Sequence, residues 1–259
     1  MRKGAPGLLP LAWLLLGAQA NPSAKPVLVP DVSQREVEIA YSFTGADLLL
    51  FGAILYPGGR LPSDRVPTDI VVVVKGPTQP ILVREKEKVA GIWVNAERLR
   101  YETAPSFYAI ASSRPMRRLL DDRTRAIYEL GVDSLQLSPA SSAAPPVQDR
   151  FQRGLVDLME KKGLYFEAPG SVSIADGVLY RARVTIPARV PVGRFTAETF
   201  LIRDGRVLAA AVREIDIRKS GFERVVARAA QRRGWAYGLA AVALSVLLGW
   251  GAGWIARRL

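Results

Sequence analysis

The sequence of 259 residues contains no cysteine and no histidine. These absences exclude a Cys/His zinc site, a disulfide, a c-type haem attachment and the Ser-His-Asp and Cys-His catalytic arrangements. Carboxylates, lysine, arginine, tyrosine, serine and threonine remain available for chemistry, and none of them forms a catalytic motif in this sequence. We therefore expect a protein that is not an enzyme and needs no cofactor.

The net charge of +12 lies mostly at the two ends of the chain. Arg2 and Lys3 supply two of these charges, residues 218–258 supply a net +7, and residues 21–217 keep only +3. A body this close to neutral offers no basic stripe to a phosphate backbone, so we do not expect nucleic acid as a partner. Basic residues beside an apolar segment commonly meet anionic lipid, which makes inner-membrane lipid the expected partner of the ends.

The first twenty residues have the features of a secretory signal peptide. Arg2-Lys3 precedes a leucine-rich run over 8–16, and the segment ends in Ala18-Gln19-Ala20. This pattern predicts cleavage after Ala20 and export of the rest of the chain. An uncleaved anchor is the alternative, although the apolar run is short for a span of about 20 residues.

Residues 237–255 form a second apolar segment, which carries no charge and has arginine pairs on both sides. Its length predicts a single membrane-spanning helix with a cytoplasmic tail over 256–259; a buried core helix is the alternative. Gly249 and Gly253 have the small-xxx-small spacing of a helix-packing face. The basic segment 219–236 is expected to form a helix that rests on the outer lipid surface or stands as a solvated stalk.

The body, residues 21–218, is expected to be one periplasmic domain built mainly from short strands. Residues 37–43 alternate between apolar and polar, 70–74 are β-branched throughout, and Asp204-Gly205 separates two strand-like runs. Further strands are predicted over 48–56, which is apolar on both faces and so central, and over 81–83, 89–94 and 107–111. Short strands with turns between them favour an immunoglobulin-like β-sandwich.

A change of period predicts that a helical excursion over 114–170 interrupts the strands. Apolar residues follow helical spacing over 116–130 and again over 151–159. The segment between the two helices, 138–146, reads SPASSAAPP and is expected to be a mobile linker.

Six residues in the body are candidates for a ligand or partner site. Lys75, followed by Gly76-Pro77 after a buried strand, would hold an oxyanion together with Arg84, or would simply begin a turn. Trp93 and Tyr108 either line a groove or fill the core. The last two candidates, Arg181 and Arg183, lie on one face of a predicted strand and would contact an anion.

Several segments of the sequence together resemble those of a known family. They are VEIAYSFTGADLLLFGAIL over 37–55, DIVVVVKGPTQPILVREKEKVAGIWV over 69–94, PSFY over 105–108, GLY and EAPG within 163–170, VGRF over 192–195, and the terminal apolar segment. With them the chain resembles the alphaproteobacterial putative transmembrane protein family. The resemblance implies a signal peptide, an exported domain and one C-terminal anchor, but no activity, cofactor or catalytic residue.

Members of that family are often associated with sulfite-exporter-like permeases, which implies an accessory role. We therefore expect a non-enzymatic protein of the inner membrane whose periplasmic domain binds a partner, as an accessory subunit of a membrane transporter complex. The alternative is a periplasmic module that binds a small anion for a sulfite-exporter-like permease, through Lys75, Arg84 or the face that carries Arg181 and Arg183.

Overall fold

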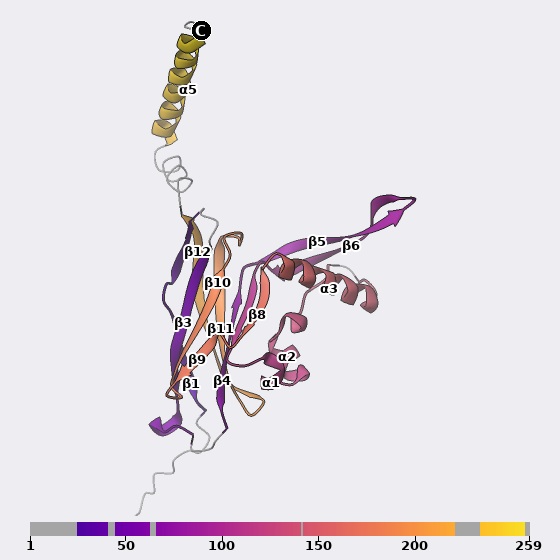
Figure 1. The fold of residues 1–259 in the computed structure, drawn as a ribbon, viewed down its shortest axis with the longest axis vertical. Helices are drawn as coiled ribbons and strands as arrows, with labels where there is room; N and C mark the ends of the chain where they lie inside the picture. The colour runs from indigo at the N-terminus through magenta and orange to yellow at the C-terminus, as the bar shows by residue number, and fades with distance from the viewer. Residues whose placement is uncertain (1–24, 41–44, 63–65, 141, 221–233, 257–259) are drawn as a thin grey trace, which may run out of the picture.

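The computed structural model describes residues 25–256 of the chain, apart from 41–44, 63–65, 141 and 221–233 (Figure 1). Most of the described residues belong to strands, which form two sheets and one long hairpin. The mainly β architecture is therefore confirmed, with a few helices beside it. The predicted signal peptide lies outside the described residues.

The four-stranded sheet, called here the small sheet, has the order β1-β3-β10-β9 and is antiparallel throughout. The six-stranded sheet, called the large sheet, has the order β2-β12-β11-β4-β7-β8, with a parallel pair at each end. The strands of the small sheet are β1 (Val27–Val32), β3 (Ala46–Leu55), β10 (Leu179–Ile186) and β9 (Val172–Ala175). Those of the large sheet are β2 (Glu36–Ala40), β12 (Arg206–Ser220), β11 (Gly193–Arg203), β4 (Thr68–Lys75), β7 (Tyr108–Ser112) and β8 (Tyr165–Pro169).

Two hydrophobic cores lie on opposite faces of the large sheet. The first fills the space between the two sheets and contains Ile54 and Val184 from the small sheet and Phe195 from the large one. The second lies between the large sheet and the helices and includes Ile110 of β7 and Leu155 of the longest helix in the body. The protein is thus built in three layers, with the large sheet in the middle (Figure 1).

The strand β4 lies at the centre of this arrangement and is buried on both faces. Its residues Ile70 to Val74 are inaccessible to solvent. Ile70, Val72 and Val74 face the first core, whereas Val71 and Val73 face the second. A β-branched run suits a strand in which both faces pack, so the buried strand predicted over 70–74 is confirmed.

The helical excursion is shorter and more broken than predicted. One continuous helix over 116–130 is wrong, because Leu120 is extended and separates α1 (Met116–Leu119) from α2 (Asp122–Tyr128). The Asp121 side chain accepts a hydrogen bond from Thr124 N and caps α2, and this bond lowers the pKa of the carboxyl below its ordinary value. A short turn, η2 (Val132–Ser134), follows.

The end of the predicted excursion belongs to the large sheet. The helix expected around 151–159 is confirmed as α3 (Pro145–Lys161), but β8 follows it within the expected excursion and pairs in parallel with β7. The predicted linker over 138–146 is also partly wrong. Ser138 O accepts a hydrogen bond from Glu102 N at 3.0 Å, Ala140 N donates one to Arg100 O at 2.8 Å, and α3 has begun by Pro145.

A long hairpin replaces the separate strands predicted over 81–83 and 89–94. It consists of β5 (Thr78–Val89) and β6 (Ile92–Pro105), and it projects from the body (Figure 1). The predicted strand over 89–94 is wrong because the chain reverses there, at Ala90-Gly91, where both residues have positive φ. The base of the hairpin is covered by the second core, whereas its tip extends beyond the helices.

The hairpin of β11 and β12 is confirmed, with Asp204-Gly205 at its turn. Both turn residues have positive φ, 51° and 70°, as a type I′ turn requires. The strand β12 continues to Ser220 and pairs in parallel with β2, so the helix predicted from residue 219 is wrong at its start. The rest of that prediction lies over 221–233, outside the described residues, and reaches α5 (Gly234–Ala256).

The helix α5 contains the predicted terminal segment. Its described apolar side chains, such as Leu244 and Leu248, are exposed, and a Cβ added at Gly249 or Gly253 would meet no atom within 4 Å. Among the residues that the structure describes, no helix has both the length and the apolar character to cross a membrane.

Truncation of Leu155 tests whether the helical layer shares the central core. Leu155 is fully buried, so we expect Leu155→Ala to lower the free energy of unfolding by about 2–5 kcal/mol. Leu158 lies on the same helix but is 44% exposed, and Leu158→Ala should change stability by no more than about 0.5 kcal/mol. Urea unfolding followed by circular dichroism measures both. Equal effects would show that α3 does not belong to the core.

Candidate functional site

The structure places the six predicted site residues in three separate regions. Lys75 and Tyr108 are partners in the register of β4 and β7. Arg84 and Trp93 lie on the projecting hairpin, on β5 and β6. Arg181 and Arg183 lie on the outer face of the small sheet, where both are exposed. The structure therefore does not bring these residues together into one anion site.

Two carboxylates surround the ammonium group of Lys75. Its Nζ lies 3.1 Å from Glu129 Oε2 and 3.3 Å from Glu198 Oε2, and the side chain is 20% exposed. One positive charge against two negative charges leaves the cluster net negative. Such a cluster repels an anion, so the structural role of Lys75 is to join β4, β11 and the end of α2.

Close packing explains the glycine that follows Lys75. A Cβ at Gly76 would lie 2.5 Å from Ser106 Oγ and 3.0 Å from Phe107 N, both of which are in the neighbouring segment. Gly76 N also donates a hydrogen bond to Phe107 O at 2.8 Å. Only glycine allows the two segments to approach this closely. The turn interpretation of Lys75-Gly76-Pro77 is wrong, because Gly76 and Pro77 connect β4 directly to β5 and both form backbone hydrogen bonds to the segment Ser106-Phe107.

Tyr108 is a core residue that positions Glu129. Its hydroxyl donates a hydrogen bond to the carbonyl oxygen of Glu129, and its ring packs edge-on against Tyr165, with 5.9 Å between the ring centroids. Burial raises the pKa of Tyr108 above its ordinary value, so the hydroxyl stays neutral and keeps donating. This bond fixes the end of α2 and places the Glu129 carboxylate beside Lys75.

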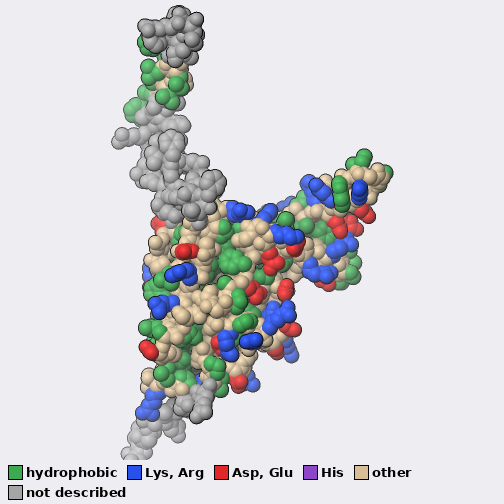
Figure 2. All heavy atoms as spheres, in the orientation of Figure 1, with side chains coloured by type: hydrophobic (Ala, Val, Ile, Leu, Met, Phe, Trp, Pro, Cys, Tyr) green, Lys and Arg blue, Asp and Glu red, His purple; other side chains and the backbone are tan. Residues whose placement is uncertain are grey.

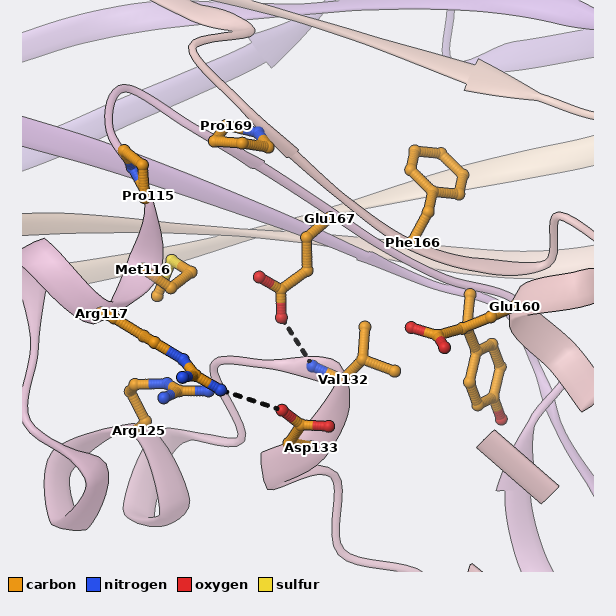
Figure 3. Close-up of a pocket in the computed structure, with 11 residues that line it drawn as sticks. Pro115, Met116, Arg117, Arg125, Val132, Asp133, Glu160, Phe166, Glu167 and Pro169 are labelled. Carbon is orange, nitrogen blue, oxygen red and sulfur yellow. Dashed lines mark hydrogen bonds and ion pairs between the residues drawn. The ribbon is translucent and has the colours of Figure 1, made fainter. Parts of the chain in front are cut away.

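A cavity of about 570 Å³ lies between β8 and the helices (Figure 3). Figure 3 shows the Glu167 carboxylate pointing to the backbone of Val132, and its Oε1 accepts a hydrogen bond from Val132 N at 2.9 Å. The buried Arg125 guanidinium donates to Leu130 O at 3.2 Å and contacts Asp122 at 3.0 Å. The Glu167 bond joins η2 to β8, and the Arg125 contacts hold the two ends of α2 in place, so we assign the cavity a structural role.

The two faces of the projecting hairpin carry opposite charges. Side chains alternate along a strand, and the register pairs Arg84 with Arg98 and Lys88 with Trp93, so these residues share the face that is turned away from the helices. The residues of this basic face are Arg84, Lys86, Lys88, Arg98 and Arg100. The opposite face carries Glu85 and Glu97, and both of them contact Arg150 of α3.

The tip of the hairpin is apolar and exposed. Ile92 is 69% exposed, Trp93 is 64% exposed, and Val89 and Val94 are also exposed. Figure 2 shows hydrophobic and charged side chains gathered at the end of this arm. Large apolar side chains at the far end of a projecting arm cannot stabilise the cores and are therefore available for contact with another surface.

A second exposed apolar surface lies on the outer face of the small sheet. In the register, Val27 of β1 is opposite Leu55 of β3, and Leu179 of β10 is opposite Ala53 of β3. The large side chains of this surface, called here the outer patch, are Val27, Val29, Phe51, Leu55 and Leu179, and all of them are exposed. Contiguous exposed apolar residues on a folded domain are typical of an interaction site.

Two arginines border the outer patch. Arg181 is opposite Phe51 and Arg183 is opposite Leu49, both in the pairing of β10 with β3. Neither arginine forms an ion pair with another residue of the described chain. The outer patch therefore combines an apolar surface with uncompensated positive charge along one side.

Sequence reasoning identified the arginines but missed the outer patch. The strand β1 is not among the predicted strands, although Val27, Leu28 and Val29 are all apolar. The apolar residues on both faces of 48–56 predict a central strand, which is confirmed, but they do not by themselves indicate that one face stays exposed. The observed β3 is central in its sheet, yet only one of its faces is covered.

A known protein family matches most of the chain. The family described as "Putative transmembrane protein (Alph_Pro_TM)" matches residues 27–258, from the start of β1 to the end of the terminal segment. The chain belongs to this family. No curated protein matches it.

Removal of the Lys75 charge tests its structural role. Lys75→Met leaves two carboxylates without their cation, and we expect it to lower the free energy of unfolding by about 1–3 kcal/mol, because the group is only partly buried. The matched variant Arg84→Met removes an exposed cation that has no ion pair and should leave stability unchanged. Urea unfolding compares them. A Lys75→Met protein as stable as Arg84→Met would contradict the assignment.

Proposed function

We propose that this protein is a membrane-anchored accessory subunit that binds a partner protein through the outer patch and carries out no catalysis itself. The observation that carries the proposal is the contiguous exposed apolar surface of β1, β3 and β10, with Arg181 and Arg183 at its side. Its chemistry fits a partner whose surface is apolar with carboxylates at the margin. Such a partner belongs to the same membrane complex, for which a transporter is the candidate.

We further propose that the two sheets form an immunoglobulin-like sandwich. In the order in which they neighbour one another in the sheets, β1, β3, β10 and β9 take the places of the A, B, E and D strands, and β12, β11, β4 and β7 take those of G, F, C and C′. The parallel pair of β7 and β8 departs from that pattern, because a helical segment connects the two strands. The fold supports a binding role only as an analogy; the outer patch carries the argument.

We propose that the chain is anchored once in the inner membrane, with its body in the periplasm. Support comes from the signal-peptide pattern over 1–20 and from the uncharged segment 237–255, which coincides with α5. In this arrangement Gly249 and Gly253 offer a small-residue face to a helix of the partner.

The alternative, a periplasmic module that binds small anions for a permease, has less support. The candidate cations lie in three separate regions, and Lys75 is already neutralised by Glu129 and Glu198. Anion recognition needs several donors that converge on one site. Neither Arg84 on the hairpin nor Arg181 on the small sheet converges with Lys75.

A fusion tests the topology. Alkaline phosphatase joined after Ser220, where β12 ends, should be active because the enzyme matures only outside the cytoplasm. The same fusion without residues 1–20 is the control and should be inactive. A well-expressed but inactive fusion of the complete chain would refute the periplasmic assignment.

Substitutions in the outer patch test the binding role. We expect Leu55→Ser combined with Leu179→Ser to abolish co-purification of the partner from detergent-solubilised membranes, because both side chains are more than half exposed and their loss affects the contact rather than the core. Ile127→Ser changes an equally exposed apolar residue on α2 and is the matched control. Partner recovery that is unchanged in the double variant would contradict the proposal.

A further inference from the structure

The projecting hairpin leaves the body at the end from which the chain continues to α5. In the large sheet, Lys75 at the end of β4 is opposite Thr196 of β11, and Thr196 is opposite Glu214 near the end of β12. The hairpin begins three residues after Lys75, at Thr78. Figure 1 accordingly shows the tip of the hairpin toward the same end of the body as the end of β12. An anchor that follows β12 would therefore bring the hairpin near the membrane.

The basic face of the hairpin has no compensating acid for most of its charges. Arg84 and Arg98 are directly opposite each other, and like charges in such cross-strand pairs are unfavourable. Within the described chain, Arg84, Lys86, Lys88 and Arg98 form no ion pair; Arg100 contacts Glu102 at 3.2 Å. Glu85 and Glu97 lie on the other face of the hairpin, where both contact Arg150. An anionic surface outside the chain would compensate these positive charges.

The tip has the chemistry of the boundary between headgroups and hydrocarbon. Trp93 is opposite Lys88 on the basic face, and Val89 and Ile92 flank the turn. An indole ring prefers the headgroup level, lysine reaches lipid phosphates, and aliphatic side chains enter the outer part of the acyl layer. The basic residues along the hairpin would meet the lipid phosphates, and the apolar residues at its tip would meet the acyl chains below them. The order of residues along the hairpin therefore matches the order of layers at a bilayer surface. The outer patch shows no such order.

We propose that the basic face and tip of this hairpin bind the anionic phospholipid surface of the membrane in which α5 is anchored. The inference rests on the proposed anchor, because tethering keeps the hairpin at a high effective concentration of lipid, so that even a weak contact is occupied. The contact is a second attachment of the body beside the anchor. It restricts the orientation of the small sheet and its outer patch relative to the membrane.

The absence of cysteine makes a site-specific test possible. The complete chain with Ile92→Cys, labelled with a nitroxide, is reconstituted into vesicles of phosphatidylcholine and phosphatidylglycerol. Collisions with oxygen and with a water-soluble nickel chelate then report the depth of the label. We expect the Ile92 label to be shielded from the chelate and accessible to oxygen. A label at Ile127→Cys, which is similarly exposed on α2, should stay in water.

Charge variants test the role of the basic face. Arg84→Gln combined with Arg98→Gln removes two like charges that oppose each other, so the hairpin should remain folded while the shielding at residue 92 is lost. Arg181→Gln combined with Arg183→Gln removes two exposed arginines from β10 instead; it is the matched control and should keep the shielding. Pure phosphatidylcholine vesicles and high salt should each reduce it.

A third label separates failure of the anchor from failure of the hairpin contact. A nitroxide at Leu244→Cys on α5 should lie in the hydrocarbon. If it remains in water, the anchor is wrong and the proposed function fails with it. If it lies in lipid while the Ile92 label stays in water, the hairpin inference alone is overturned. Shielding of Ile92 that appears only in native membranes containing other proteins also overturns it and assigns the tip to a protein partner.

Discussion

The burial of β4 on both faces is the constraint on which the rest of the structure depends. A strand with Ile70 to Val74 fully buried needs cover on both sides, so the large sheet must have a layer above and a layer below it. The small sheet supplies one layer and the helical segment supplies the other. The two segments that flank β7, the β5–β6 hairpin and the chain from α1 to α3, together build the second core.

This arrangement determines which surfaces remain for other molecules. The central strands of the large sheet, β4 and β7, are covered on both faces, whereas the small sheet is an outer layer, and one of its faces carries the outer patch. The base of the hairpin is held by the helices through Arg150, but its far end extends past them. The proposed protein contact and the proposed lipid contact therefore use different parts of the body.

The elements that were predicted correctly from the sequence are those determined by residues close together in the chain. The Asp204-Gly205 turn and the β-branched run of β4 are such local signals, and both gave correct elements. The break at Leu120 was missed because the apolar period continues across it, while the Asp121 cap competes with helix continuation. The role of Lys75 could not be predicted, because Glu129 is 54 residues away and only the folded sheet brings the two together.

The sheet order also determines when the domain can fold during synthesis. The strands β2, β3 and β4 find their neighbours β12, β10 and β11 only near the end of the body, so the early half of the chain stays incomplete until the late strands emerge. The last register pair, Ser220 with Ala40, closes the large sheet, and only the 13 residues 221–233 separate it from the start of α5. Completion of the fold and arrival of the terminal helix are therefore nearly simultaneous, and until then the apolar strands need protection from aggregation.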